Sequence, residues 1–293
     1  MEKMYRLEML VAICISGFVG VMTVNVDWPS AGISAARALI GTAFIGLMML
    51  IGRKKLHWQL IKKNFPVLLL GGVVLGAAWT LLAQAIKMAG SPVASVCYNM
   101  APIFIMIGAP LLINEKLKAH KVIAILISAV GVLIISDIKG GTVSVMGVIL
   151  ALIGAAFSGG LTFINKAIQD LDRLERSFVQ EAIAGVLIFA YAAITQGFSS
   201  YSFTMHNITG ALILGLMAGC FQIVFAFDAI AHLPAQTSAL MYFIDPVIAI
   251  ISSAILINQV MTPTQLLGSL LIIGAVTASE IIGYRKHKKS LQS

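Results

Sequence analysis

Charged side chains are scarce in this sequence. Only 11% of its 293 residues are Asp, Glu, Lys or Arg, whereas 59% are hydrophobic. Soluble domains have about 25% charged and about 45–50% apolar residues. One aqueous core cannot bury this excess of apolar surface, so lipid must solvate most of the chain. The composition therefore excludes an ordinary soluble domain and makes the lipid bilayer a partner.

Cysteines are also few, and their spacing fits neither a disulfide framework nor a metal site. Cys14, Cys97 and Cys220 all lie inside apolar runs, as small buried hydrophobic residues do. The sequence has no H-E-x-x-H, G-x-S-x-G or G-x-x-x-x-G-K motif, and its five histidines are scattered. These absences argue against a membrane enzyme. We expect no catalytic residue, no metal and no cofactor.

Ten apolar segments have about the length of 20 residues that a helix needs to cross a bilayer. The connections between them are short, so consecutive helices should pack antiparallel. The sequence therefore predicts an all-α membrane protein with ten transmembrane helices. The segments are residues 7–24, 33–52, 66–87, 92–113, 119–136, 144–165, 178–196, 208–230, 236–257 and 262–284.

The net charge of +8 does not indicate nucleic acid, because the basic residues lie between apolar runs and not on one face. If the N-terminus is cytoplasmic, 17 of the 20 Lys and Arg residues fall on the cytoplasmic side. The positive-inside rule then predicts that both termini are cytoplasmic. The segment MEKMYR precedes a long apolar run without a small-residue cleavage site before Asn25, which favours a retained first span. We expect a multi-pass protein of the bacterial cytoplasmic membrane.

An internal repeat organises the chain. The stretch AIKMAGSPVASVCYNMAPIFIMIGAPLLINEKL begins at Ala85, and its copy AIAHLPAQTSALMYFIDPVIAIISSAILINQVM begins at Ala229. A shift of 144 positions aligns the two without gaps. The matched residues include Tyr98 with Tyr242, Pro102 with Pro246, Asn114 with Asn258 and, further away, Arg37 with Glu181.

The number of spans between the copies gives the repeat a geometry. Five spans separate each helix from its copy, and an odd number reverses direction. The halves 1–136 and 144–284 are therefore predicted to be inverted five-helix repeats, followed by a basic cytoplasmic tail at 285–293. Such repeats are frequent in secondary transporters, which bind their substrate between the halves near mid-depth.

The first copy, extended to GVLII, resembles the signature of the drug/metabolite transporter superfamily, EamA type. The residues that carry this resemblance are Ala85, Ala94, Ser95, Pro102, Glu115 and Gly131, with Arg37 in the second helix. The resemblance covers nearly the whole chain, twice over. Two positions differ from the family pattern: Ser16-Gly17-Phe18 replaces a Trp-Gly pair, and Gln259 replaces the acidic residue in the second half.

The resemblance implies ten helices in two inverted repeats. Helices one to four and six to nine would line a central cavity, with helices five and ten at the periphery. It also implies transport without ATP, often export, of small metabolites, amino acids or drugs.

Polar side chains within apolar segments are candidates for the site, because their burial in a membrane is costly unless they are paired or hydrated. Asp245 is the clearest, since it lies near mid-depth directly before Pro246, and proline frees backbone carbonyls of the preceding turn. We expect it to bind a cationic group or to carry a proton. The other predicted substrate-binding residues are Trp79, Tyr98, Asn99, Gln222 and Tyr242. Contacts between helices are the alternative role for Tyr98, Asn99 and Tyr242, and a lipid-facing or core position is the alternative for Trp79.

A second group of polar residues is expected to act in proton coupling or as a gate, together with Asp245. It consists of Gln84, Asp228, Arg37 and Glu181. We expect Arg37 to pair with Asp27 at the outer mouth, and Glu181 with Arg176 or Lys166 at the inner mouth. A structural ion pair or a side chain reaching to the membrane surface is the alternative for both.

These features predict a secondary active transporter that exports a small organic solute by alternating access, with protons as one option for the coupling ion. Import of a small metabolite or a cationic nutrient is the alternative, because gradients and not the sequence set the direction. A channel is disfavoured, since channels usually rely on oligomer symmetry or a filter loop. The chain carries its two-fold symmetry within itself, and we expect a monomer or a weak homodimer.

Overall fold

The computed structural model describes residues 2–24, 26–54, 56–89, 91–135, 144–168, 170–197, 200–256 and 262–290. Every regular element in these ranges is helical. Seven helices are continuous, and they are α1 (Glu2–Val24), α2 (Ser30–Ile51), α3 (Trp58–Ala89), α6 (Ala119–Ile135), α7 (Val145–Ala167), α8 (Arg173–Gln196) and α13 (Pro263–Ser290).

Three further helical runs are divided. They are α4 (Ser91–Tyr98) with α5 (Ala101–Leu112), α9 (Met205–Leu214) with the π-helix η2 (Gly215–Gln222) and α10 (Ile223–His232), and α11 (Ala235–Tyr242) with α12 (Asp245–Leu256). Each run overlaps one segment predicted from the sequence. Eight of the runs are long and apolar enough to cross a membrane, and Ala119–Ile134 is a shorter apolar helix. That the chain crosses the bilayer ten times remains a prediction.

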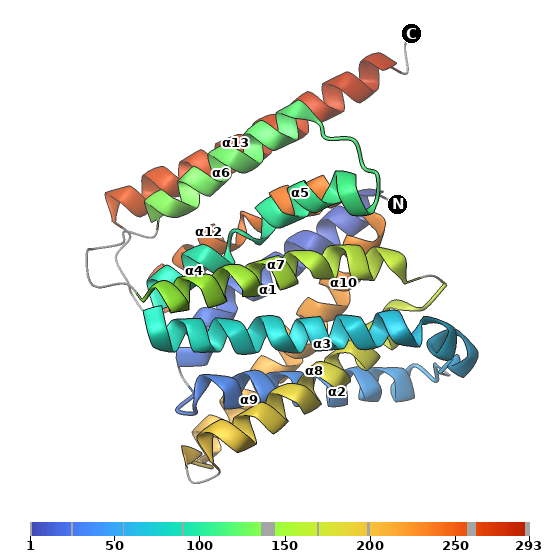
Figure 1. Cartoon of the computed structure of the whole chain (residues 1–293), viewed down its shortest axis with the longest axis vertical. Coiled ribbons are helices and arrows are strands. Elements are labelled where there is room, and N and C mark those ends of the chain that lie inside the picture. The colour runs from blue at the N-terminus through green and yellow to red at the C-terminus, as the bar shows by residue number, and fades with distance from the viewer. Residues whose placement is uncertain are drawn as a thin grey trace.

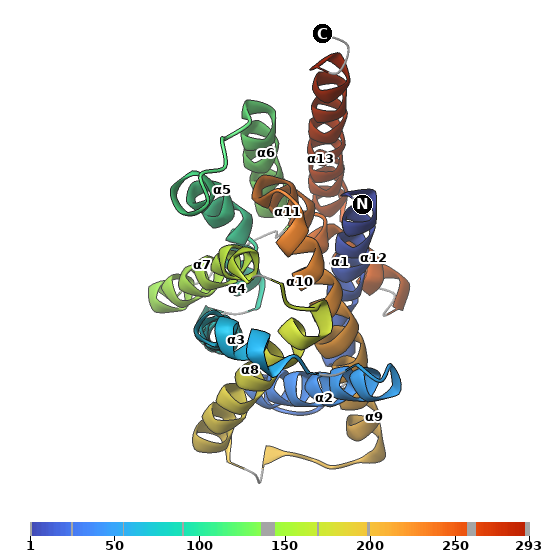
Figure 2. The same cartoon turned by 90° about the vertical axis from the view of Figure 1, so that its right-hand side faces the viewer.

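The packing of the helices is the same when the two halves are exchanged (Figures 1 and 2). Helix α3 packs on α7 and α8, while its counterparts η2 and α10 pack on α1 and α2. Helix α5 packs on α7, and α12 packs on α1. Helix α2 contacts its own copy α8, and α6 contacts its own copy α13 at one edge of the molecule. This pattern is the one that a pseudo-two-fold axis between the halves produces.

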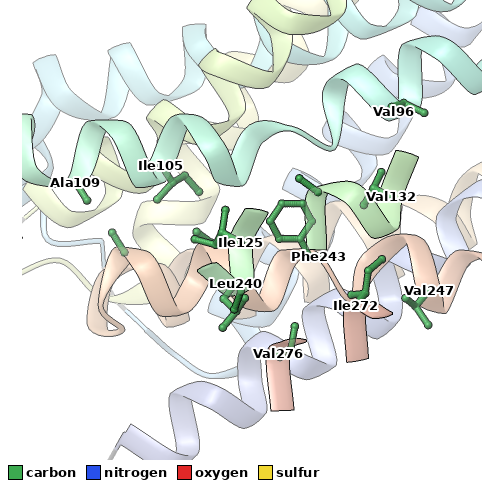
Figure 3. Packing of buried hydrophobic residues seen from close by; sticks show 14 residues of the cluster. Val96, Ile105, Ala109, Ile125, Val132, Leu240, Phe243, Val247, Ile272 and Val276 are labelled. Atoms are coloured by element: carbon green, nitrogen blue, oxygen red, sulfur yellow. The ribbon is translucent and has the colours of Figure 1, made fainter. Parts of the chain in front are cut away.

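A buried apolar cluster joins the two halves (Figure 3). Phe243, which is 1% exposed, lies among Val96 and Ile105 of the first half and Leu240 and Ile272 of the second. Burying a Phe side chain contributes about 1.5–3 kcal/mol, so this cluster favours close packing of the halves. Many other large apolar side chains are exposed, as side chains that face lipid would be.

Several connections lie at one end of the bundle, which we call the basic face. It comprises residues 52–54, 56–57, 113–118, 168, 170–172 and 233–234. Lys54 contacts Asp172, Lys166 at the end of α7 contacts Leu233, and Glu115 contacts Ala235 at the start of α11. In Figure 1 this end is at the right, where α1 begins and toward which α13 runs.

Helices α2 and η2 approach each other backbone to backbone. A Cβ added to Gly219 would meet the carbonyl oxygen of Arg37, and it would lie 2.9 Å from the Cα of Gly41. A Cβ on Gly41 would in turn meet the backbone of Gly219. Small residues allow such contacts between membrane helices, where no hydrophobic force holds helices together.

We expect Gly219→Ala to destabilise the protein by about 1–3 kcal/mol, because the new methyl group overlaps backbone atoms that cannot rotate away. A lower melting temperature in detergent would show this. Gly160→Ala is the matched control, since a Cβ at Gly160 meets no atom within 4 Å. Equal melting temperatures for the two variants would contradict the close approach of α2 and η2.

Candidate functional site

Two helices are interrupted at equivalent positions of the repeat. The first stops at Tyr98 and resumes at Ala101, and the second stops at Tyr242 and resumes at Asp245. The hydrogen bonds match as well: Met100 N–H to Cys97 O corresponds to Ile244 N–H to Met241 O. Interrupted membrane helices provide unpaired backbone groups and helix ends for a ligand.

Proline explains why both interruptions occur where they do. Pro102 and Pro246 are each the second residue of the new helix, a place where proline is tolerated. Neither can donate to the carbonyl four residues earlier, which belongs to Tyr98 in the first half and to Tyr242 in the second. The carbonyl oxygens of Tyr98 and Tyr242 therefore lack the N–H donor that a residue other than proline would supply at positions 102 and 246.

Asp245 is the first residue of α12. A negative charge is favoured there by the positive end of the helix dipole. Its carboxylate shares a hydrogen bond with Ser16 of α1, while its Oδ1 is buried without a hydrogen-bond partner. An acceptor that is buried and unpaired costs about 1–3 kcal/mol, so it is a place where a ligand donor or a proton would be stabilised.

Tyr98 lies near two charged residues. Its hydroxyl shares a hydrogen bond with Ser158 of α7, and it is within electrostatic range of both Arg37 and Asp245. Tyr242 is within electrostatic range of Asp245 and of Tyr98. The structure therefore places the two tyrosines near each other.

Arg37 lies against the face of Trp79, with its Cζ atom 3.8 Å from the ring centroid. The charged group that it faces is Glu181. Glu181 is 0% exposed, and neither of its carboxylate oxygens has a hydrogen-bond partner. Arg37 Nε is likewise buried without a partner. The group therefore holds opposite charges whose hydrogen-bonding capacity is not used.

The expected pairing of Arg37 with Asp27 is wrong. The groups that act electrostatically on Arg37 are Glu181 and Tyr98, and Asp27 is not among them. Arg176 and Lys166 do not pair with Glu181 either, because they donate to the backbone oxygens of Phe227 and Leu233.

The repeat explains why Arg37 meets Glu181. The two residues are 144 positions apart, as are Tyr98 and Tyr242. On a two-fold axis, a residue contacts its own symmetry mate. Both pairs join positions that the repeat exchanges and are within electrostatic range, so the repeat shift was the signal that could have identified their proximity.

Gln222 and Asn99 were predicted to belong to the same site. Gln222 ends the π-helix η2, and its Oε1 is buried without a partner. π-Helical turns frequently mark functional positions. Asn99 lies in the interruption between α4 and α5. No hydrogen bond among the described residues connects either side chain to Arg37, Tyr98 or Asp245.

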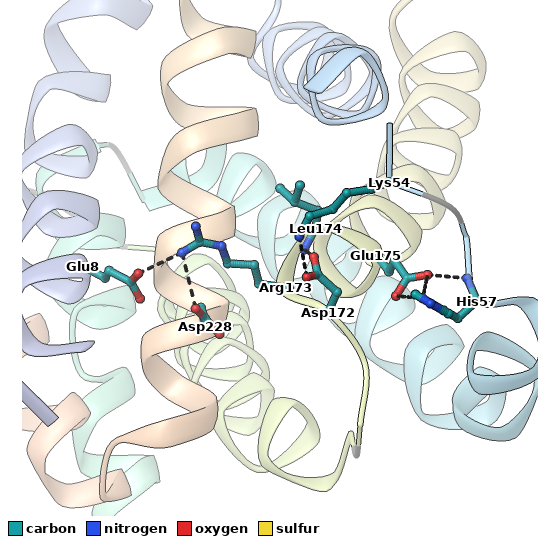
Figure 4. Close-up of polar contacts among 8 residues, drawn as sticks. All are labelled: Glu8, Lys54, His57, Asp172, Arg173, Leu174, Glu175 and Asp228. Atoms are coloured by element: carbon teal, nitrogen blue, oxygen red, sulfur yellow. Dashed lines mark hydrogen bonds and ion pairs between the residues drawn. The ribbon is translucent and has the colours of Figure 1, made fainter. Parts of the chain in front are cut away.

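Asp228 lies apart from this group, near the basic face (Figure 4). Arg173 Nη1 is 2.8 Å from Glu8 Oε1 and 3.6 Å from Asp228 Oδ2. His232, which stacks on Tyr5, is 3.4 Å from Asp228 Oδ1. These contacts connect α1 of the first half with α8 and α10 of the second, so Asp228 has a position suited to a gate. Glu8 was not predicted.

Gln84 does not join a similar contact. It is half-buried on α3, and in the described part of the chain it forms no hydrogen bond. Its predicted role at a gate therefore has no support from side-chain contacts.

Further ion pairs strengthen the basic face. Lys54 Nζ is 2.6 Å from Asp172 Oδ2, and Glu175 contacts His57. Burial raises the pKa of Asp172, but the hydrogen bonds from Lys54 and from the Leu174 N–H, with the charges of Lys54 and Arg173, hold that pKa below its ordinary value overall. Asp172 is therefore a charged N-cap of α8 at neutral pH.

A metal is not favoured at any of these places. Within the described residues, no group of three or more His, Cys, Asp or Glu side chains is arranged to hold an ion. The central group offers one guanidinium, two carboxylates, three aromatic rings and hydroxyl groups. This combination suits a small polar organic molecule.

Comparison with known proteins agrees with this arrangement. The chain is 24% identical over 255 residues to "Uncharacterized transporter YxxF" of Bacillus subtilis (strain 168), covering 84% of this chain and 79% of that protein. It is 24% identical over 266 residues to "Uncharacterized transporter YvbV" of the same strain, covering 86% of each. A solved crystal structure shares the fold with a TM-score of 0.81 at 17% identity, over 95% of this chain and 98% of that one.

The model of the EamA-like transporter family matches this chain twice, at residues 5–137 and at residues 145–279. The two matches together cover most of the chain, and the apolar helices are those of a multi-pass protein of the bacterial cell membrane. The chain therefore belongs to the EamA-like transporter family.

Proposed function

We propose that this chain is a secondary active transporter that exports a small organic solute across the cytoplasmic membrane by alternating access. The observation that carries the proposal is the pair of equivalent helix interruptions at 98–101 and 242–245. They bring Tyr98, Tyr242 and Asp245 together with Arg37, Trp79 and Glu181. Residues from both halves are thus needed to complete one site.

The proposed topology is ten crossings with both termini in the cytoplasm. The halves 1–136 and 144–284 are inverted, and 285–293 forms a basic tail. The exchangeable packing pattern of the helices supports this arrangement. The basic face is then the cytoplasmic face, as the positive-inside rule requires. Rocking of one half against the other would expose the site to each side in turn.

The charges of the site define which solutes it can hold. Arg37 and Asp245 carry opposite charges, and both are within electrostatic range of Tyr98. A solute that carries both an anionic and a cationic group, such as an amino acid, can satisfy both. The rings of Trp79, Tyr98 and Tyr242 supply surfaces for its apolar part. Metabolites and drugs of similar size and polarity fit the same description.

A thermal-shift screen of the purified protein tests this proposal. The probes are amino acids, nucleosides, polyamines and quaternary amines at millimolar concentration. A ligand at about 100 times its Kd stabilises the folded protein by about 2.7 kcal/mol, so a binder raises the melting temperature. The binder should also show saturable counterflow in proteoliposomes. Flux without saturation or counterflow would indicate a channel and contradict the proposal.

A further inference from the structure

The connection between α5 and α6 closes over the N-terminus of α11. Glu115 Oε2 accepts a hydrogen bond from the Ala235 N–H at 2.8 Å, and its Oε1 accepts one from the Gln236 N–H at 3.3 Å. Pro234, which precedes α11, provides no side-chain cap. A carboxylate from the first half of the chain therefore caps a helix of the second half, where the helix dipole also favours its charge.

The side chain of Gln236 completes this contact. It is 0% exposed. Its Nε2 donates to Glu115 Oε1 at 2.8 Å and to the Lys116 carbonyl at 2.9 Å, and its Oε1 accepts from the Lys118 N–H at 2.9 Å. One turn later, Lys121 Nζ donates to the Thr237 hydroxyl. We call this set of contacts the clasp; its members are Glu115, Lys116, Lys118, Lys121, Ala235, Gln236 and Thr237.

The clasp has to break when the basic face opens. Opening separates the α5–α6 connection from α11 and leaves the first donors of α11 and a buried amide without partners. Hydrogen bonds to charged groups contribute about 1.5–3 kcal/mol each, and a buried polar group left unpaired costs a comparable amount. Closure of the basic face is therefore stabilised by several contacts that act together.

The opposite end of the bundle cannot form the same contact. The shift of 144 residues places Gln259 where the clasp has Glu115, and Pro92 where it has Gln236. Gln259 lies outside the described residues, but its amide has a single acceptor oxygen and no charge. Pro92 has neither a backbone N–H nor an amide side chain. The two residues that carry most of the clasp therefore have no equivalents.

One further counterpart at that end, Thr262, forms a local contact. Thr262 corresponds to Lys118 in the repeat. The Thr262 N–H donates to Gln265 Oε1 at 3.0 Å, and the Gln265 N–H donates to Thr262 Oγ1 at 3.2 Å. This reciprocal pair caps α13 and does not bridge the two halves.

We propose that the clasp holds the basic face closed in the resting protein, and that the lack of a counterpart leaves the site open toward the opposite side. The proposal rests on the alternating access proposed above. Glu115 and Gln236 thereby set the balance between two conformations that a perfectly symmetric repeat would populate equally. Both residues act without touching the solute.

Accessibility of the site from each side tests the proposal. Cys14, Cys97 and Cys220 are replaced by Ala, and Ser158→Cys places one thiol beside Tyr98. Its labelling rate with a membrane-impermeant thiosulfonate is measured in right-side-out and inside-out vesicles. A separate variant, Leu117→Cys, identifies which vesicles expose the basic face, because Leu117 lies in the α5–α6 connection and is 48% exposed.

The parent should be labelled at least about tenfold faster from the side opposite the basic face, since one lost charged hydrogen bond corresponds to about a tenfold shift. Glu115→Gln should raise the rate from the basic face by about tenfold, and Gln236→Ala should do the same. The double variant should add little, because both residues belong to one set of contacts.

Two control variants distinguish the effect of breaking the clasp from the effect of changing the charge. Lys116→Gln removes a charge from the same connection but keeps the carbonyl that Gln236 binds, so the labelling ratio should not change. Gln259→Glu adds the acid at the opposite end, where Ser91 has an N–H but Pro92 offers neither an N–H nor an amide side chain, so it should change the ratio less than Glu115→Gln does.

A merely structural role of Glu115 would lower the melting temperature without changing the ratio of the two labelling rates. An unchanged ratio in a folded Glu115→Gln protein therefore overturns the proposal. A parent labelled mainly from the basic face, or from neither side, overturns it as well. Labelling needs no solute, so failure of the proposed function would show separately, as absence of binding and counterflow in the parent.

Discussion

Asp245→Asn is expected to abolish proton-driven accumulation of solute in proteoliposomes, by at least about a hundredfold, while exchange of solute across the membrane continues. The asparagine has nearly the same shape and can still hydrogen bond with Ser16, but it cannot take up and release a proton at ordinary pH. Net transport that is coupled to protons needs that step, whereas exchange of one solute molecule for another does not. The measurement is uptake driven by an imposed pH gradient, compared with counterflow at equal pH.

Asp170→Asn is the control for this substitution. Asp170 lies on the basic face, its side chain is 71% exposed, and its contact with Lys63 is a loose 3.8 Å. Proton-driven uptake should be unchanged in that protein. If Asp245→Asn retains proton-driven uptake, Asp245 is not the coupling group; if exchange is lost as well, its role is to bind the solute.

Arg37→Gln and Glu181→Gln should each destabilise the protein by about 1–3 kcal/mol, whereas the double substitution should recover most of this loss. Each single change leaves one charge buried without its partner, which is more costly than removing both charges. Glu181 is 0% exposed, so water cannot replace Arg37 in the folded protein. Melting temperatures of the four proteins in one detergent form a double-mutant cycle that measures the coupling.

An exposed pair provides the comparison. Lys54 and Asp172 are 2.6 Å apart, but their side chains are 46% and 34% exposed. Breaking this pair with Lys54→Gln should cost at most about 1 kcal/mol. Additive effects of Arg37→Gln and Glu181→Gln would show that the two charges do not interact. That result would contradict the placement of Arg37 close to Glu181.

The helical segments could be predicted from the sequence because apolar length alone identifies them. The local breaks were harder to predict: Pro246 indicated a loosened turn, but only the structure shows that Asp245 begins a new helix. The side chains of the central group were also recognised, since polar residues stand out in apolar segments. The contacts of each side chain depend on how helices far apart in the sequence pack against each other. The spacing of residues within one helix does not predict that packing.

The contacts of the basic face show the same limit. In the sequence, Glu115 lies at the end of an apolar segment beside Lys116 and Lys118, and nothing there indicates that it caps α11, 120 residues away. Glu8 was not predicted to be functional, because it lies near the start of the first helix, where a charged residue is common. Its contact with Arg173 requires the first half and the second half to be folded together.

The contact between Gly41 and Gly219 can serve as a pivot for motion of α2 relative to η2. At this contact no side chains interlock between the two backbones. A small rotation of one helix against the other therefore does not require a side chain to leave its packing site. The carbonyl oxygen of Arg37 is part of this contact. We therefore expect the ends of α2 and η2 to move furthest during such a rotation, while the guanidinium of Arg37 moves little.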